Sequence, residues 1–570
     1  MPLHNADIAA VFEEIADLLE LGDENPFRIR AYRNAARVVG SLSLDLAARL
    51  AEGAELPKLP GIGADLGGKI REIAATGSCK LLEQLRRKFP AGITALLALP
   101  GLGPKRVRAL HEARIDSLED LRRAARAGRL PALPGFGEKT AQRIVEAAEA
   151  RLVAPRRFKL AVAAQYAEPL AKYLGAVVAG SYRRMKDTVG DLDFLVVSSK
   201  PEEVSARFVR YPEVREVLAQ GTTRSSVRLA SGMQADLRVV PRQSYGAALH
   251  YFTGSKAHNI AVRKLGIERG LKINEYGVWR GEKRIGGETE ESVYAAVGLP
   301  YIEPELRENQ GELEAARRGE LLRLLELSDL RGDLHAHTSA SDGHNTLREM
   351  ALAAKARGLE YLAITDHSRR LAMAHGLDPR RLEQQMAEID VVNRDLRGIT
   401  LLKGIEVDIL EDGSLDLPDS ILSKLDLVVA AVHGGFGLSR ARQTARVLKA
   451  LDNPHVSILA HPTGRLLGER EACELDMLAV VRKAKRRGMA LELNAHPDRL
   501  DLNDVHCRMA KDEGVLVAVG SDAHGVDGFE VLRYGVGQAR RGWLEKKDVL
   551  NARPLAKLRS WLARAIRKER

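Results

Sequence analysis

GSYRR at residues 180–184 and GDLD at residues 190–193 indicate a small loop with a hydroxyl and two guanidiniums, followed by a strand with two carboxylates. Side chains alternate across a strand, so Asp191 and Asp193 project from the same face. Carboxylates this close repel each other unless a divalent cation lies between them. A third acid, Asp236, follows in another strand-like run. A lone DxD is common at exposed strand ends, but a Mg²⁺ site beside an arginine-bearing phosphate loop is what nucleotidyl transfer requires.

The composition is that of a folded protein of several domains with excess positive charge. For 570 residues we expect about three to five domains. Apolar residues make up 45% and charged residues 29% of the chain, which excludes a disordered or fibrous protein. The net charge of +11 suits a polyanionic partner. Residues 99–160 alone contain fourteen Lys and Arg against seven Asp and Glu.

The cysteines and the N-terminus predict a cytoplasmic protein. Cys79, Cys473 and Cys507 lack the spacing of a metal site and cannot form a disulfide framework, which favours a reducing compartment. The first residues have no basic and apolar signal pattern, and no apolar run of 18 residues follows. We therefore expect neither export nor a membrane partner.

A short motif occurs three times in the N-terminal part: LPGIG at 59–63, LPGLG at 99–103 and LPGFG at 133–137. Each copy is expected to introduce an amphipathic helix. Glycines at a helix N-terminus let backbone N–H groups bind a phosphate oxygen, so binding would depend on the backbone and weaken with salt. The pattern resembles helix-hairpin-helix DNA-binding motifs, whereas turns that only pack helices are the alternative. The glycines concerned are Gly61, Gly63, Gly101, Gly103, Gly135 and Gly137.

From about residue 158 the pattern changes to a mixed α/β unit. Apolar runs predict strands at 176–179 and 193–197, and strands within 226–240 that end at Pro241. Residues 207–218 are predicted to be a helix.

Two more motifs, YFTGS at 251–255 and NEY at 274–276, complete a set. Together with the phosphate loop and the three acids, they resemble the X-family DNA polymerases, the family of DNA polymerase beta, over roughly residues 1–300. The resemblance implies that Asp191, Asp193 and Asp236 hold two catalytic ions, Mg²⁺ or Mn²⁺. It also implies contacts to the incoming deoxynucleoside triphosphate (dNTP) by Gly180, Ser181, Arg184, Tyr251, Phe252, Gly254 and Asn259.

The resemblance also implies that Arg263 contacts the DNA minor groove and that Lys69 forms a Schiff base with 5′-deoxyribose phosphate. Two departures stand out. Asp65 replaces a basic residue near Lys69, which puts the lyase activity in doubt. Met185 replaces a usual glycine after the two arginines.

A second chemistry begins with HAH at residues 335–337, where both imidazoles would face one side of a strand. Further His, Asp and Glu residues recur at the ends of apolar runs separated by helices, the pattern of a βα barrel that collects strand-end side chains on one face. Such a multinuclear site suits Mn²⁺, Zn²⁺ or Fe and phosphoester hydrolysis. The candidate ligands are His335, His337, Asp342, His367, Glu406, His433, His461, Asp522 and His524.

Residues 331–570 resemble a polymerase and histidinol phosphatase (PHP) domain, which implies a distorted seven-stranded βα barrel with about three ions, Mn²⁺ and/or Zn²⁺. The order of modules resembles the bacterial X-family DNA polymerases with a C-terminal PHP domain. The predicted fold is thus multidomain, α and α/β. The predicted parts are a helical lyase-like domain with a helix-hairpin-helix motif (1–90), fingers with two such motifs (91–155), a nucleotidyltransferase palm (156–242), a thumb (243–302), a helical linker (303–330) and the PHP domain (331–570).

The predicted function is a monomeric DNA-directed DNA polymerase that fills short gaps in gapped or primer-template DNA during base excision repair. The resemblance adds a 3′→5′ exonuclease, and cleavage at abasic sites, in the PHP domain. Three alternatives stay open: a nuclease whose palm only grips DNA, a small-molecule phosphatase, and a DNA-binding scaffold without catalysis.

Overall fold

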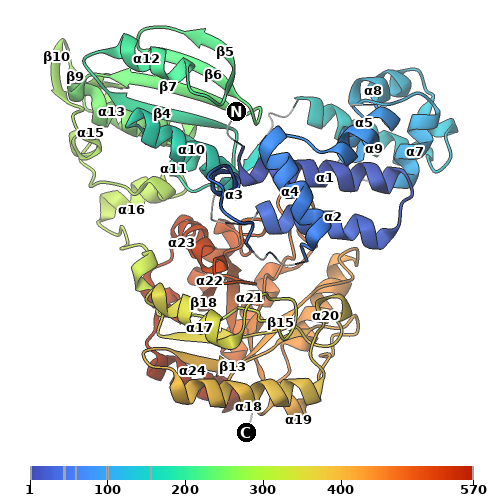
Figure 1. Cartoon of the computed structure of the whole chain (residues 1–570). Coiled ribbons are helices and arrows are strands. Elements are labelled where there is room, and N and C mark those ends of the chain that lie inside the picture. Colours follow the sequence, from blue (N-terminus) through green and yellow to red (C-terminus); the bar gives the residue numbers. More distant parts are fainter. Residues whose placement is uncertain are drawn as a thin grey trace. The chain divides into compact units, whose positions relative to one another are not determined.

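The computed structural model describes residues 3–40, 42, 46–57, 59, 61–90, 92–97, 99, 102–153 and 157–567. Gly101, one of the predicted phosphate-binding glycines, lies outside these residues. The chain divides into two compact units, Met1–Phe158 and Lys159–Arg570 (Figure 1). Within the described ranges, no helix combines the length and the apolar character needed to cross a membrane.

The first unit is built from helices. Ile8, Phe12 and Ile15 recur at helical spacing on α1 and are fully buried, with Tyr32 and Val39 of α2 in the same core. The helices are α1 (Asn5–Leu21), α2 (Pro26–Gly40), α3 (Leu46–Ala51), α4 (Ala64–Thr76), α5 (Lys80–Lys88), α6 (Thr94–Leu97), α7 (Pro104–Glu112), α8 (Leu118–Arg126) and α9 (Glu138–Val153).

The described motif glycines stand where helices begin. Gly63 and Gly103 are the N-cap residues of α4 and α7, and Gly137 directly precedes α9. Gly61 (φ 60°) and Gly135 (φ 82°) are in the left-handed region, which other residues rarely adopt. The expectation that these motifs introduce helices is therefore confirmed at the described positions.

The palm is a five-stranded mixed sheet in the order β2-β4-β7-β6-β5, with β4 parallel to β7. The register pairs Asp193 with Asp236, so the two carboxylates are neighbours across the central strands. The elements are β1 (Phe158–Lys159), α10 (Leu160–Leu174), β2 (Val177–Val178), α11 (Gly180–Arg183), β3 (Thr188–Val189), β4 (Asp191–Val197), α12 (Pro201–Val209), β5 (Val214–Gln220), β6 (Arg224–Leu229) and β7 (Gln234–Val240).

The helix predicted at residues 207–218 is wrong. The helix α12 ends at Val209, and β5 starts at Val214 as the edge strand of the sheet. Pro212 explains the break, because proline disfavours helical conformation in the residue before it. As an edge strand exposed along most of its length, β5 has no alternating apolar pattern that could have revealed it.

The thumb follows as two helices, a three-stranded sheet and a third helix: α13 (Tyr245–Thr253), α14 (Lys256–Ile267), β8 (Lys272–Asn274), β9 (Gly277–Arg280), β10 (Lys283–Gly286) and α15 (Glu290–Ala296). The linker predicted to be helical contains one short α-helix, α16 (Glu312–Arg318), and two 3-10 turns, Pro304–Leu306 and Leu327–Asp329. Leu324 forms an antiparallel bridge with Glu545, and Leu325 is fully buried. The helix α16 therefore does not continue through the linker, and Leu324 packs in a core that the thumb shares with Trp543 of the last domain.

The last domain contains eight labelled strands, β11 to β18. Since β13 (Thr400–Lys403) and β14 (Glu406–Asp408) are two parts of one interrupted strand, the eight together form a barrel of seven parallel strands. The other strands are β11 (Gly332–Asp333), β12 (Tyr361–Ile364), β15 (Val428–Ala431), β16 (Val456–Leu459), β17 (Ala490–Asn494) and β18 (Val517–Gly520). A parallel bridge between Ala336 and Ala523 links the first strand to the last. The distorted seven-stranded βα barrel is confirmed.

Helices alternate with these strands, as predicted (Figure 1). They are α17 (Leu347–Ala356), α18 (Pro379–Asp395), α19 (Asp419–Leu422), α20 (Arg440–Ala450), α21 (Met477–Arg487), α22 (Asp504–Glu513), α23 (Leu532–Arg541) and α24 (Leu555–Arg567).

Two candidate active sites

The palm acids lie on the adjacent strands β4 and β7. Asp193 faces the turn at Gly180, whose φ of 63° requires glycine. A Cβ atom at residue 180 would lie 2.5 Å from Asp193 Oδ2, so only glycine lets the phosphate loop approach the acid this closely.

The palm acids repel one another, as expected for a cation site without its ion. Burial, together with the nearby carboxylates of Asp191 and Asp236, raises the pKa of Asp193 to about 7. Asp236 accepts hydrogen bonds from Ser226 and from Gln234 (2.8 Å). Among the described residues, the three acids do not converge closely enough to form a complete ligand group. A divalent cation between them would remove the repulsion that raises this pKa.

The two arginines of the phosphate loop are held differently. Arg183 forms a bidentate ion pair with Glu290 of the thumb (2.8 and 2.7 Å). Arg184, the predicted triphosphate ligand, donates from Nε to Glu308 (2.9 Å) and from Nη1 to the carbonyl of Thr253 (2.8 Å). Sequence reasoning missed Glu290 and Glu308, since no local motif marks them.

The predicted sugar pocket forms a connected group. Asn259 donates from its amide to the carbonyls of Tyr251 (2.6 Å) and Gly254 (3.2 Å) and so fixes the turn after α13. A Cβ atom at Gly254 would lie 2.7 Å from Asn259 Oδ1, which explains the glycine. The guanidinium of Arg263 lies 6.0 Å from the Tyr251 ring. The guanidinium of Arg238, which sequence reasoning did not single out, lies 5.0 Å from the Phe252 ring.

In the PHP domain, the predicted ligands lie at the carboxyl ends of the barrel strands, and eight of the nine form three groups of potential metal-binding atoms. The groups share His337 and His367, so they join into one cluster. Its groups are His337, Asp342, His367 and His524; His335, His337 and Asp522; and His367, Glu406 and His433.

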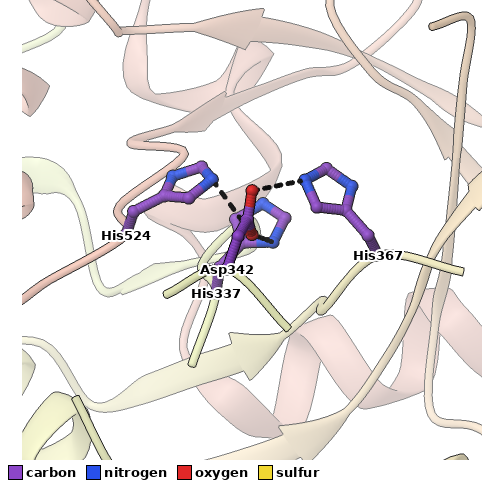
Figure 2. Close-up of side chains that lie close together, drawn as sticks. All are labelled: His337, Asp342, His367 and His524. Atoms are coloured by element: carbon purple, nitrogen blue, oxygen red, sulfur yellow. Dashed lines mark ion pairs between the residues drawn. The ribbon is translucent and has the colours of Figure 1, made fainter. Parts of the chain in front are cut away.

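The first group converges on one carboxylate (Figure 2). Asp342 lies 3.5 Å from both His524 Nε2 and His367 Nε2, and 3.9 Å from His337 Nδ1. His461, the ninth predicted ligand, belongs to no group, but its Nε2 lies 2.9 Å from Glu406 Oε1. Both His461 (φ 23°) and Asp522 (φ 55°) have left-handed backbones, a strain typical of functional sites.

Several buried atoms of this cluster lack the partners that buried polar atoms normally have. Within the described part of the chain, His335 Nε2, Glu406 Oε2 and His461 Nδ1 form no hydrogen bond. All three residues are at most 2% exposed. The unpaired nitrogen and oxygen atoms fit divalent ions bound by mixed N and O ligands.

The charges of the cluster also call for cations. Although burial acts in the opposite direction, the carboxylates of Glu492, Asp522 and Glu406 raise the pKa of His335 well above its usual value. Burial would raise the pKa of Glu406, but the imidazoles of His433, His335 and His367 hold it well below its usual range. Without metal ions, the acids thus favour the protonated form of His335, and the imidazoles around Glu406 favour its charged form.

The structure adds two carboxylates that sequence reasoning missed. Glu492 in β17 is 2% exposed, and its Oε1 lies 2.6 Å from His335 Nδ1. Its Oε2 accepts from the backbone N–H of His461 (2.7 Å). Asp408 lies 3.3 Å from His433 Nδ1 in the same way. Carboxylates of this kind orient metal-binding histidines, and they leave Nε2 for the ion.

A third predicted site lies in the first unit, around Lys69. A cavity of about 480 Å³ is lined by Lys69, Asp65 and Lys80, among other residues. Lys69 forms an ion pair with Asp65, the residue that departs from the family pattern. Burial lowers the pKa of the ammonium, but the hydrogen bonds and charges of Asp65 and Tyr32 together outweigh this and raise it above its usual value.

Comparisons with known proteins agree with this arrangement. Four family models match: a helix-hairpin-helix domain at residues 3–79, a SAM-like helix-hairpin-helix tandem at 93–150, a DNA polymerase beta thumb at 248–308 and a PHP domain at 333–496.

Relatives of two kinds are similar to this chain. The DNA polymerase/3′-5′ exonuclease PolX of Bacillus subtilis (strain 168) is 39% identical over 99% of this chain and all of its own length. Probable phosphatases of Thermoanaerobacter sp. (strain X514) and Acetivibrio thermocellus are 33% and 35% identical. Each covers 35% of this chain and 81% and 82% of its own length, respectively. Because the Bacillus protein is similar from end to end, the chain belongs to the X-family DNA polymerases with a C-terminal PHP domain.

Proposed function

We propose that this protein adds deoxynucleotides to a DNA primer at the palm and removes nucleotides from a DNA 3′ end at the PHP domain. The observation that carries this proposal is the presence of two separate acidic sites in one chain that resembles the Bacillus polymerase and exonuclease throughout. We further propose that it acts as a monomer on short gaps during base excision repair, and that it also cleaves DNA at abasic sites.

In the proposed polymerase site, Asp191, Asp193 and Asp236 hold Mg²⁺ or Mn²⁺, which would activate the primer hydroxyl and balance the triphosphate charge. Ser181 and Arg184 bind the triphosphate. Gly254, kept in place by Asn259, brings the backbone against the sugar, where it leaves no room for a 2′-hydroxyl.

In the proposed nuclease site, the nine predicted ligands hold Mn²⁺ and/or Zn²⁺, about three ions, which would supply an activated water for phosphodiester hydrolysis. Glu492 and Asp408 orient His335 and His433. DNA is bound along its backbone by the helix-hairpin-helix glycines, so affinity for any sequence should fall as salt rises.

The test is a pair of assays on one preparation: filling of a one-nucleotide gap with Mg²⁺ or Mn²⁺, and shortening of 5′-labelled single-stranded DNA. Both activities are expected. Absence of gap filling, with intact nuclease activity, would favour the nuclease whose palm only grips DNA. The similarity to probable phosphatases makes a small-molecule phosphatase the second candidate. Faster turnover of a sugar phosphate than of single-stranded DNA would favour it.

Replacing Glu492 with glutamine should weaken the nuclease selectively. The amide keeps the volume of the side chain but loses the charge that orients His335, and loss of such a partner typically costs about 10–100-fold in metal affinity or activity. The exonuclease rate at limiting Mn²⁺ measures the effect. Primer extension serves as the control, and an equal loss of both activities would contradict a role confined to the PHP site.

Replacing Asp65 with asparagine should increase Schiff-base formation at Lys69. A Schiff base needs the neutral amine, and Asp65 stabilises the ammonium, so trapping should be weak at neutral pH and rise as the pH increases. Without the carboxylate, this rise should move to lower pH, with about threefold more trapping at pH 7.5. Borohydride trapping of a 5′-deoxyribose phosphate end measures it.

Lys69→Ala is the control for this experiment and should abolish trapping. Undiminished trapping in Lys69→Ala would place the amine elsewhere in the chain. No change on removal of Asp65 would show that the ion pair does not limit the reaction.

A further inference from the structure

The triphosphate loop of the palm, residues 180–187, starts with the one-turn helix α11 and packs against helix α23 of the PHP domain. Met185 has a left-handed backbone (φ 53°), a conformation that residues other than glycine rarely adopt. A Cβ atom at Gly537 of α23 would lie only 2.5 Å from Met185 Cε. Met185, at a position where the family usually has glycine, therefore packs directly against Gly537 of the PHP domain.

Arg541, at the end of α23, connects the two domains at the same place. It is 6% exposed and donates from Nη1 to the backbone carbonyl of Arg184 and to Glu308, both at 3.0 Å. Its Nη2 donates to Asp504 of the PHP domain (2.6 Å). Since Glu308 also accepts from Arg184, one PHP arginine reaches both the backbone and the side-chain partner of the predicted triphosphate ligand.

The other end of the loop is also held by the PHP domain. Arg465 forms an ion pair with Asp187 (3.2 Å) and donates to the carbonyls of Arg499 (2.8 Å) and Leu500 (2.5 Å). The loop therefore has a contact to the PHP domain on each side of Lys186.

The charge balance at Glu308 determines how strongly this carboxylate holds Arg184. Burial would raise the pKa of Glu308, but Arg184 and Arg541 together keep it below its usual value, so the carboxylate is charged. Arg184 shares Glu308 with Arg541 and with Lys186 (3.8 Å), so the carboxylate is not paired with Arg184 alone. Without Arg541, Glu308 would compete more strongly with a triphosphate for Arg184.

We propose that Arg541 is a positioning residue for nucleotide addition, through which the PHP domain holds the triphosphate loop of the palm in its binding geometry. The inference rests on the proposed function of the palm. It assigns to the PHP domain a second role that is independent of its metal cluster, because Arg541 belongs to none of the three ligand groups.

The test compares Arg541→Ala with Arg540→Ala in the full-length chain. Arg540 is the neighbouring residue on α23, but it pairs with Glu305 (2.7 Å) and Glu303 (3.2 Å) and not with the loop. Single-nucleotide gap filling gives kcat and the KM for dNTP, and exonuclease activity on single-stranded DNA is measured on the same samples. Arg541→Ala should raise the KM for dNTP about tenfold, with kcat and the exonuclease rate within about twofold of wild type.

Arg540→Ala should leave all three quantities within about twofold. Should Arg541→Ala not fold, Arg541→Lys replaces it. Lysine keeps the charge but not the forked geometry that serves three acceptors, so we expect about a threefold increase in KM. An unchanged KM in the folded variants, or a parallel loss of kcat and exonuclease activity, would overturn the proposal. A wild-type protein without gap filling would instead refute the polymerase function on which the proposal rests.

Discussion

Asp193→Ala is expected to abolish nucleotide addition and to leave 3′→5′ exonuclease activity intact. Asp193 lies beside Asp191 on the same strand and beside Asp236 across the sheet, and the carboxylates of both help to raise its pKa. Loss of a ligand that helps hold the catalytic cations costs several kcal/mol of transition-state stabilisation, which corresponds to about a thousandfold or more in rate. Extension of a 5′-labelled primer on gapped DNA measures the loss.

The matched control for this prediction is Glu216→Ala, a carboxylate on the edge strand β5 of the same sheet. Among the residues that the structure describes, the Glu216 carboxylate forms an ion pair only with the exposed Arg228 (3.2 Å), and surface pairs contribute little. This variant should extend primers at the wild-type rate. If Asp193→Ala also lost exonuclease activity, while its unfolding curve matched wild type, the two reactions would share one site and the two-site proposal would be wrong.

The candidate catalytic residues could be selected from the sequence because short local patterns contain them. The two-residue spacing of Asp191 and Asp193 places both side chains on one face of a strand. His335 and His337 have the same spacing. Strand ends in a βα barrel meet on one side, so ligands far apart along the chain could be assigned to one cluster by their positions at those ends. The structure brings eight of the nine together.

The residues that support the sites could not be predicted in this way. Glu492 contacts His335 across 157 positions, and Arg541 reaches Arg184 across 357. Neither belongs to a recurrent motif, because its partner is set by the packing of distant elements. The edge strand β5 was not predicted for a different reason. It is exposed along most of its length, so burial imposes no alternating apolar pattern on its sequence.

His335→Ala should produce the opposite result to Asp193→Ala, with exonuclease activity lost and primer extension retained. His335 is fully buried among Glu406, Asp522 and Glu492, so its removal leaves those acids without the group that balances them when no ion is bound. Loss of a ligand from a multinuclear site removes several kcal/mol of stabilisation, and we expect exonuclease activity to fall by about a thousandfold or more.

His455→Ala is the control for His335→Ala, because it lies just before β16, at the opposite end of the strands from His461. The predicted cluster occupies only the carboxyl ends, so this variant should keep its full exonuclease rate and metal content. Metal analysis of the purified proteins provides a readout independent of activity, with fewer bound ions expected in His335→Ala alone. Wild-type metal content together with a lost exonuclease would contradict the role of His335 as a ligand. Loss of primer extension as well would mean that the PHP ions also support the palm. Arg541 could not explain such a loss, because its hydrogen bonds between the two domains go to Arg184, Glu308 and Asp504, which are not predicted ion ligands.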